Sequence, residues 1–350
     1  MKTSNNKRKA IALLSGGLDS RLAVKMILDQ GIEVEAVNFV TVFCTCTARS
    51  SCKSEARKAA EEYGIGLKTL NTTRELLDAV RNARHGYGRG VNPCLDCRIS
   101  MFRKAGEYMR EAGAGFIVTG EVWGERPMSQ RPDAMRLIEK ESGLEGLIVR
   151  PLSAHLFEPS IPERKGWVNR EKLMAMEGRS RKPQMQLAAE IGVNDYPCPA
   201  GGCLLCEKDF AVRLRTLLEE NPDPPIAEIQ SLRLGRIFFA GNGNRIIIPR
   251  NEEETRRLTA LAQPGDVLMS AGGGIMGPTS VIKGKPVGEA ALLEAAALTA
   301  RYGQGREAEK VTVEYYPAPG DSENARPDDC GILEILPADG WRLAEELERQ

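Results

Sequence analysis

The stretch Lys9–Leu14 followed by Ser15-Gly-Gly-Leu-Asp-Ser20 decides the fold, because an apolar strand runs through a glycine pair directly into a helix. The helical pattern ends at Gly31, a residue typical of the position after a helix. Glycines let backbone N–H groups turn toward an anion, and the start of a helix adds partial positive charge. The stretch therefore predicts a phosphate-binding turn at the edge of a sheet.

Strand-like segments rich in β-branched residues alternate with helical segments after this turn. The expected strands are Val34–Val42, Gly66–Leu70, Phe116–Thr119 and Leu147–Val149. Helices of about ten or more residues between successive strands are typical of parallel sheets. We therefore expect an α/β fold with a doubly wound parallel sheet.

A second, smaller domain is expected after the Pro-rich segment Asn221–Pro225. A chain of 350 residues is long enough for two domains, since single cores stop growing near about 250–300 residues. Beyond this segment, Arg236–Ala240 and Arg245–Ile248 have the pattern of a hairpin closed by glycine and asparagine. We expect the α/β domain to cover residues 1–220 and an α+β domain to cover residues 228–340.

The composition limits the partners of the protein. Formal net charge is zero, so affinity for RNA must come from local patches, such as the Lys and Arg residues between Pro162 and Pro183. No apolar run reaches the roughly 20 residues that a membrane span needs, and the N-terminus lacks a signal-peptide pattern. We therefore expect a cytoplasmic protein that does not bind membranes.

The glycine turn does not follow the Walker pattern, which needs Lys-Ser or Lys-Thr where this chain has Asp19-Ser20. The string instead resembles the PP-loop of ATP pyrophosphatases, which split ATP between the α and β phosphates. The resemblance implies that ATP binds with its pyrophosphate against Ser15, Gly16, Gly17 and Ser20. It also implies that Asp19 orients the loop or a Mg²⁺ ion and is needed for catalysis.

Cysteines in two distant segments form the second motif. The chain has nine cysteines and two histidines, and in a cytosolic protein such thiols are free, redox-active or metal-bound. Cys94 and Cys97 form one C-x-x-C pair, and Cys203 and Cys206 form another. This spacing lets two thiolates face one metal, one cluster or each other. The cysteines Cys44, Cys46 and Cys52 have no assigned role.

Both cysteine segments resemble those of tRNA 2-thiouridylases. Asn92-Pro-Cys-Leu-Asp-Cys-Arg98 resembles their Asn-Pro-x-x-x-Cys segment, and Gly201–Phe210 resembles their Gly-x-Cys-Phe segment. The resemblance places the two sulfur-handling cysteines at Cys97 and Cys203. In related thiolases with an extra cysteine, as at Cys94 here, three cysteines hold an iron–sulfur cluster.

Three interpretations of the cysteines remain open. A [4Fe-4S] cluster on Cys94, Cys97 and Cys203 would leave one iron free to carry sulfur. Alternatively, Cys203 carries a persulfide and Cys97 resolves it. In the third interpretation the same three cysteines bind a structural Zn²⁺ with Cys206 as the fourth ligand.

The segment Val118–Arg131 follows an expected strand and should lie beside the glycine turn. The matching place in 2-thiouridylases reads Thr-Gly-His, whereas this chain has Gly120-Glu121. The segment is also similar to the Thr-Gly-Glu-x-x-Gly-Gln of 4-thiouridine synthetases, so the modified atom of the uridine stays open. We expect Gly120 to let the backbone approach the nucleotide, and Arg126 and Arg131 to bind phosphate.

Three segments near the C-terminus resemble the RNA-binding domain of NFACT proteins. They are Pro264–Leu268, Gly277–Lys283 and Leu292–Tyr302. The resemblance implies RNA contacts through Lys283, Lys285, Arg301 and Arg306. The alternatives are a stabilising lid or a homodimer contact.

Taken together, the resemblances imply ATP-dependent thiolation of a uridine in tRNA. The uridine carbonyl would be adenylated at the PP-loop, and sulfur from sulfide or a persulfide carrier would then replace AMP. Two alternatives share the PP-loop: an amide-forming synthetase, and a protein that binds ATP and RNA without catalysis.

Overall fold

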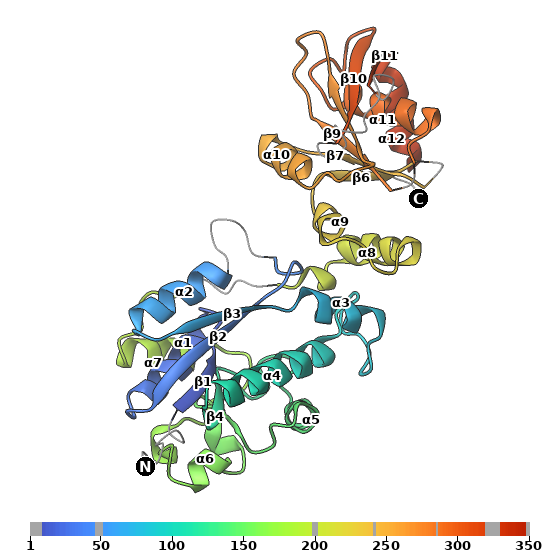
Figure 1. The fold of residues 1–350 in the computed structure, drawn as a ribbon. Coiled ribbons are helices and arrows are strands. Elements are labelled where there is room, and N and C mark those ends of the chain that lie inside the picture. Colours follow the sequence, from blue (N-terminus) through green and yellow to red (C-terminus); the bar gives the residue numbers. More distant parts are fainter. Residues whose placement is uncertain are drawn as a thin grey trace. The chain divides into compact units, whose positions relative to one another are not determined.

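The computed structural model describes residues 9–45, 52–197, 202–240, 243–284, 286–318 and 330–347, with the side chain of Cys52 left undescribed. Cys46 and Lys285, noted above, lie outside these residues. The chain forms two compact units, Met1–Ala211 and Val212–Gln350 (Figure 1). In the described ranges no helix combines the length and the apolar character needed to cross a membrane.

The first unit is built on a five-stranded parallel sheet, which confirms the predicted fold class. Its strands lie in the order β3-β2-β1-β4-β5, and every neighbouring pair is parallel. The strands are β1 (Lys9–Leu13), β2 (Glu33–Val40), β3 (Leu67–Asn71), β4 (Phe116–Thr119) and β5 (Ile148–Val149). Strand β1 lies between β2 and β4, where the strand order reverses, and ligands bind at this point in open α/β sheets.

Helices cover both faces of this sheet (Figure 1). Side chains of successive residues in β1 point to opposite faces, so Ala10 and Ala12 lie in one buried cluster and Ile11 in another. The first cluster packs against α1 (Leu18–Leu28), α2 (Cys52–Glu62) and α7 (Lys182–Glu190). The second packs against α4 (Cys94–Glu111) and α5 (Pro132–Ser142), and α3 (Thr73–Arg81) packs against α4. The short helix α6 spans Ile161–Arg164.

The second unit is a six-stranded antiparallel sheet with helices on both faces, which confirms the expected α+β class. Its order is β11-β10-β8-β9-β7-β6. The strands are β6 (Arg236–Phe239), β7 (Arg245–Ile248), β8 (Val267–Ala271), β9 (Ser280–Lys283), β10 (Val311–Pro317) and β11 (Gly331–Ile335). Helices α11 (Glu289–Arg301) and α12 (Pro337–Leu347) share one buried cluster with the sheet, and α10 (Glu252–Ala260) packs on the other face.

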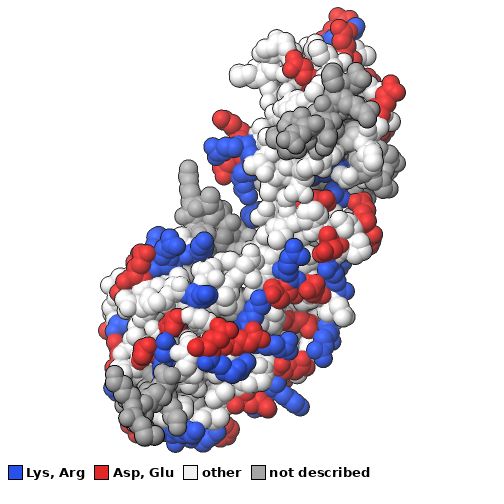
Figure 2. Space-filling view, viewed as in Figure 1, with Lys and Arg blue, Asp and Glu red and all other residues white. Residues whose placement is uncertain are grey.

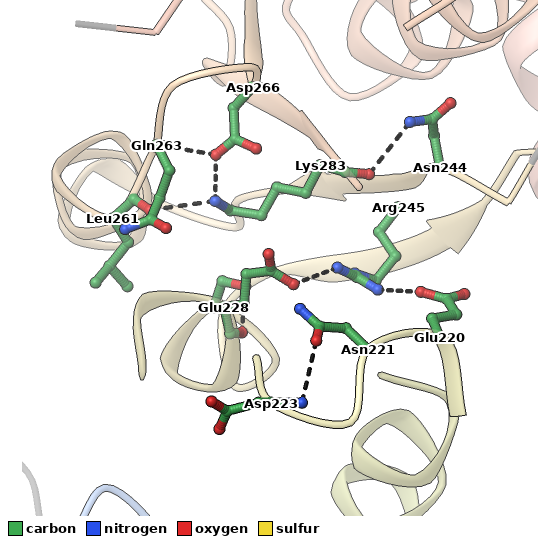
Figure 3. Close-up of polar contacts among 11 residues, drawn as sticks. Glu220, Asn221, Asp223, Glu228, Asn244, Arg245, Leu261, Gln263, Asp266 and Lys283 are labelled. Atoms are coloured by element: carbon green, nitrogen blue, oxygen red, sulfur yellow. Dashed lines mark hydrogen bonds and ion pairs between the residues drawn. The ribbon is translucent and has the colours of Figure 1, made fainter. Parts of the chain in front are cut away.

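Buried ion pairs attach the connecting helices to the second sheet (Figure 3). The side chain of Arg245 donates to Glu220, at the end of α8 (Lys208–Glu220), and to Glu228 of α9 (Ile226–Ser231), the latter at 2.7 Å. Arg245 is 2% exposed and forms ion pairs with both helices, so it attaches α8 and α9 to β7. The division between the units accordingly falls at Ala211, before the Pro-rich segment that separates α8 from α9.

Lys283 is a second buried cation in this unit, and its expected contact with RNA is wrong. Its ammonium group forms an ion pair with Asp266 and donates to the Leu261 carbonyl at 3.1 Å (Figure 3). The side chain is fully buried. Lys283 therefore joins the end of β9 to the turn before β8 and has no surface for a nucleic acid.

Candidate active site

The glycine turn joins β1 to α1 as predicted, and its two serines face each other. The hydroxyl oxygens of Ser15 and Ser20 are 3.2 Å apart, and Ser20 also donates to the Gly17 carbonyl at 2.9 Å. Gly17 is the N-cap of α1 and offers no side chain to the first N–H groups of the helix. Those N–H groups and the two hydroxyls are the groups that the predicted anion site at the start of α1 would use.

Gly16 is required at its position for two reasons. Its φ is +82°, which favours glycine, and a Cβ there would lie 2.4 Å from the Glu55 carbonyl carbon in α2. The Gly16 carbonyl accepts a hydrogen bond of 3.0 Å from Arg21 Nε, and Arg21 forms an ion pair of 2.6 Å with Glu62. Sequence reasoning missed Arg21. The available signal was an arginine one helical turn after Leu18, at an otherwise apolar position.

Gly120 directly follows β4 and lies against the start of α1. A Cβ at Gly120 would lie 2.5 Å from the carbonyl carbon and oxygen of Asp19. The absence of a side chain thus lets the segments after β1 and β4 pack together at the point where the strand order reverses. An approach of Gly120 to the nucleotide itself stays a prediction.

Asp19 holds an unsatisfied acceptor at this point. Among the described residues, its buried Oδ1 atom has no hydrogen-bond partner. Burial raises the pKa of Asp19, and the positive charges of Arg181 and Arg126 partly oppose that rise. Burial likewise raises the pKa of Glu125, with a contribution from the Asp19 charge. An unsatisfied carboxylate oxygen beside an anion site fits a hard cation such as Mg²⁺.

The arginines expected to bind phosphate separate in the structure. Arg126 is close enough to act on Asp19, whereas the exposed Arg131 pairs with Asp133 at 3.0 Å. Arg181 also acts on Asp19, although the sequence placed it only in the basic cluster before Pro183. Within that cluster Arg170 forms an ion pair with Glu163, which neutralises part of the positive charge of the segment. On the face shown in Figure 2, acidic and basic side chains are mixed over the first unit.

The first cysteine pair lies in the first turn of α4. The helix begins at Cys94, and Pro93 is its N-cap. The backbone N–H of Cys97 donates to the Pro93 carbonyl at 2.9 Å. A helix N-terminus favours thiolate over thiol. Burial nevertheless raises the pKa of Cys97 to about 11, against the opposing charge of the adjacent Arg98.

A buried ion-pair network joins α4 to the segment after β4. Glu121 pairs with Arg98 of α4 and, at 3.1 Å, with Arg150 just after β5. Burial alone would raise the pKa of Glu121, but the two guanidinium groups hold it below its usual value. Since Arg98 adjoins Cys97 and Glu121 adjoins Gly120, a continuous series of contacts links the first cysteine pair to Asp19.

The second cysteine pair is held beside the end of β2. The backbone N–H of Leu204 donates to the Phe43 carbonyl at 2.8 Å. The backbone of Cys203 forms an isolated antiparallel β-bridge with the backbone of Cys44. The neighbouring Cys206 accepts a hydrogen bond of 3.0 Å from the Asn92 side chain. Backbone and side-chain contacts thus bring the two distant cysteine segments together.

The four thiols affect one another electrostatically. The pKa of Cys203 is raised to about 12, mainly by burial, which a backbone hydrogen bond from Leu205 opposes and the charges of Cys206, Cys97 and Cys94 reinforce. All four are free cysteines. Within the described ranges, however, no three His, Cys, Asp or Glu side chains are placed so that they could hold one metal ion. The thiols therefore share one neighbourhood, and their arrangement does not fit a four-cysteine zinc site. In a [4Fe-4S] cluster each cysteine binds a different iron, so the cluster on Cys94, Cys97 and Cys203 stays a prediction.

Two protein-family models match the chain. The model described as "Thiamine biosynthesis protein (ThiI)" matches residues 5–155. The model described as "NFACT protein RNA binding domain" matches residues 235–327. These matches agree with the resemblances on both halves of the chain.

Curated relatives of the chain include tRNA-specific 2-thiouridylases. The MnmA protein of Idiomarina loihiensis is 24% identical over 247 residues, which cover 66% of this chain and 62% of that protein. The bifunctional protein NifU/MnmA of Rubrobacter xylanophilus is 33% identical over 141 residues, covering 37% of this chain and 29% of that protein. The chain thus matches 62% of the length of the first of these relatives and much less of the second.

One similar solved structure is a 4-thiouridine synthetase–RNA complex with bound ATP. The match covers 53% of this chain and 51% of the chain in that structure, with 23% sequence identity and a TM-score of 0.34.

Proposed function

We propose that this chain, a PP-loop domain of the thiouridylase type followed by an NFACT-type domain, is an ATP-dependent tRNA sulfurtransferase that thiolates a uridine. The observation that carries the proposal is the series of contacts from Asp19 through Gly120, Glu121 and Arg98 to Cys97. A phosphate-binding loop alone would suit any ATP pyrophosphatase. Converging thiols beside that loop are needed for sulfur transfer and not for amide formation.

In the first step the uridine carbonyl oxygen attacks the α-phosphorus of ATP, and pyrophosphate leaves. The hydroxyls of Ser15 and Ser20 and the N–H groups at the start of α1 bind the departing pyrophosphate. Asp19 would hold Mg²⁺, which when bound neutralises charge on the phosphates. Arg126 and Arg181 add positive charge at the same place. Adenylation makes AMP the leaving group in place of a carbonyl oxygen.

In the second step sulfur replaces AMP, and we propose a persulfide route through Cys203 and Cys97. A donor first places a terminal sulfur on Cys203, and that sulfur attacks the activated carbon as AMP leaves. The Cys97 thiolate then attacks Cys203 Sγ, which forms a Cys97–Cys203 disulfide and leaves the terminal sulfur on the base. An external thiol reductant must reduce this disulfide before the next cycle. The cluster on Cys94, Cys97 and Cys203 stays the alternative route, and we derive no step through it.

Separate measurement of the two steps tests this function. With unmodified tRNA, ATP and a persulfide donor, Cys203→Ser should still release pyrophosphate but should lower thionucleoside formation more than a hundredfold. Cys97→Ser should permit persulfide loading of Cys203 yet block the release of product. Cys206→Ser is the matched control and should retain both steps. Thionucleoside formation by Cys203→Ser at the wild-type rate would refute the role of Cys203.

Metal content separates the persulfide and cluster routes. The persulfide route predicts full activity of protein purified anaerobically without bound iron or zinc. Activity that appears only with stoichiometric iron would overturn this route and favour the cluster on Cys94, Cys97 and Cys203. Adenylation at the PP-loop would stand in either case, because pyrophosphate release is measured independently.

A further inference from the structure

A pocket of about 650 Å³ lies within the second unit. It is bounded by the turn before α10, the loop at Met276–Pro278 and the residues that follow α11. A pocket of this volume lies within the usual range for small-ligand sites, about 300–1,000 Å³. It has room for a single nucleotide.

The lining of the pocket combines charged side chains of both signs with apolar surface, since Glu252 and Glu307 lie beside Arg250 and Arg306. Arg250 donates from Nε to Glu254 at 3.0 Å. The exposed Arg306 has, among the described residues, a long contact of 3.7 Å with Glu307. Met276 contributes an apolar side chain that is 68% exposed, and Tyr302 contributes an aromatic ring. Guanidinium groups bind phosphate, and aromatic and thioether groups pack against a base.

The wall formed by Tyr302 continues as a stack of alternating cations and rings. Arg236 of β6 lies 4.6 Å from the Tyr302 ring centroid, and Arg301 lies 4.7 Å from it. Arg301 also lies 4.5 Å from the ring centroid of Trp341 in α12. Arg301 therefore contacts both rings. Trp341 is 48% exposed, so much of its ring remains available for a further stacking partner.

Close backbone contacts hold this arrangement in place. A Cβ at Gly340 would lie 2.2 Å from the Ala297 carbonyl oxygen, so the glycine lets α12 approach α11 directly before Trp341. The N–H of Gln304 donates to the Met276 carbonyl at 2.8 Å, which joins the pocket loop to the end of α11. The pocket and the stack are therefore preformed, which lowers the entropic cost of binding.

We propose that the pocket and the Trp341 ring bind unpaired nucleotides of an RNA strand. One nucleotide occupies the pocket with its phosphate toward Arg250 and Arg306, and a neighbouring base stacks on Trp341. Base stacking on aromatic rings is the usual mode of single-strand recognition, and paired bases in a duplex cannot enter such a site. The inference rests on the proposed function for the identity of RNA as the partner, but it is tested by binding alone.

The test uses the full chain and a fluorescein-labelled single-stranded RNA, compared with the same strand annealed to its complement. We expect the single strand to bind more tightly than the duplex. Trp341→Leu should weaken single-strand binding about tenfold, and Trp341→Phe should restore most of it. Arg306→Gln should weaken binding about fivefold and lower the salt slope by about 0.7.

The matched control is Arg256→Gln, an exposed arginine of α10 outside the pocket lining. It should leave affinity and salt slope unchanged. Equal losses in Arg256→Gln and Arg306→Gln, or equal binding of single strand and duplex, would overturn the site. If single strands bind selectively but no tRNA is thiolated, the site stands and the proposed function falls. If tRNA is thiolated while the pocket variants bind normally, only the site falls.

Discussion

The two units share buried ion pairs but differ at one buried carboxylate oxygen. In the second unit Arg245 and Lys283 are buried and paired with carboxylates, and both hold elements of the fold together (Figure 3). In the first unit Asp19 has a buried oxygen without a partner among the described residues, directly beside an anion site. The comparison teaches that burial of a charge does not by itself mark a functional site. An unsatisfied polar atom within such a site is the more informative sign.

The largest expected effect is on Asp19. Asp19→Asn should lower pyrophosphate release about a thousandfold, because the site loses the carboxylate that would hold Mg²⁺. It should not lower the free energy of unfolding, since the buried carboxylate has no hydrogen bond through Oδ1 to lose. Pyrophosphate assays and urea unfolding measure the two quantities. Asp29→Asn, at an exposed carboxylate paired with Lys25, should change neither. A stability loss of several kcal/mol in Asp19→Asn would place Asp19 with the structural charges.

For Lys283 we expect a loss of stability without a loss of pyrophosphate release. Lys283→Met leaves Asp266 buried and unpaired, so the second unit should lose about 3–5 kcal/mol of stability. Hydrogen exchange resolved by unit measures the loss, and pyrophosphate release by the first unit should persist. Lys310→Met is the control, because its pair with Glu334 is exposed and contributes about 1 kcal/mol or less. A Lys283→Met protein with unchanged exchange rates would contradict a structural role.

A smaller effect on stability is expected at His85. It should destabilise the folded state as the pH rises, whereas acid unfolding destabilises a protein as the pH falls. Hydrogen bonding to Asp96, reinforced by Glu141, raises the pKa of His85 above its ordinary value of 6.5. The folded state therefore binds the proton more tightly than the unfolded state. The stabilisation is complete below pH 6.5 and is lost as pH rises through the raised pKa of the folded state. Urea unfolding between pH 5.5 and pH 8.5 should show this decline. It should disappear in His85→Gln and persist in His155→Gln.

Local motifs explain what sequence alone predicted well. The serine–glycine turn after an apolar strand and the alternation of strands and helices depend on neighbouring residues, and both predicted the parallel sheet and its loop. The packing of Gly120 on Asp19 and the pairing of Glu121 with Arg98 join residues far apart in the chain. No local pattern contains such contacts, so sequence reasoning could place these residues near the site without giving their partners.

One error has the same physical origin. Lys283 was expected to be exposed because lysine usually is, but the distant Asp266 satisfies it in the interior. We expected the four thiols to lie close together. Whether they can bind one metal ion depends on side-chain placement, which the sequence does not give.

The contact at Gly120 has a consequence for how this protein can be altered. With no room for even a methyl group against the Asp19 backbone, the two loop segments can move only together. A redesign that lengthens or shifts the segment after β4 to accept another base would also displace the phosphate loop.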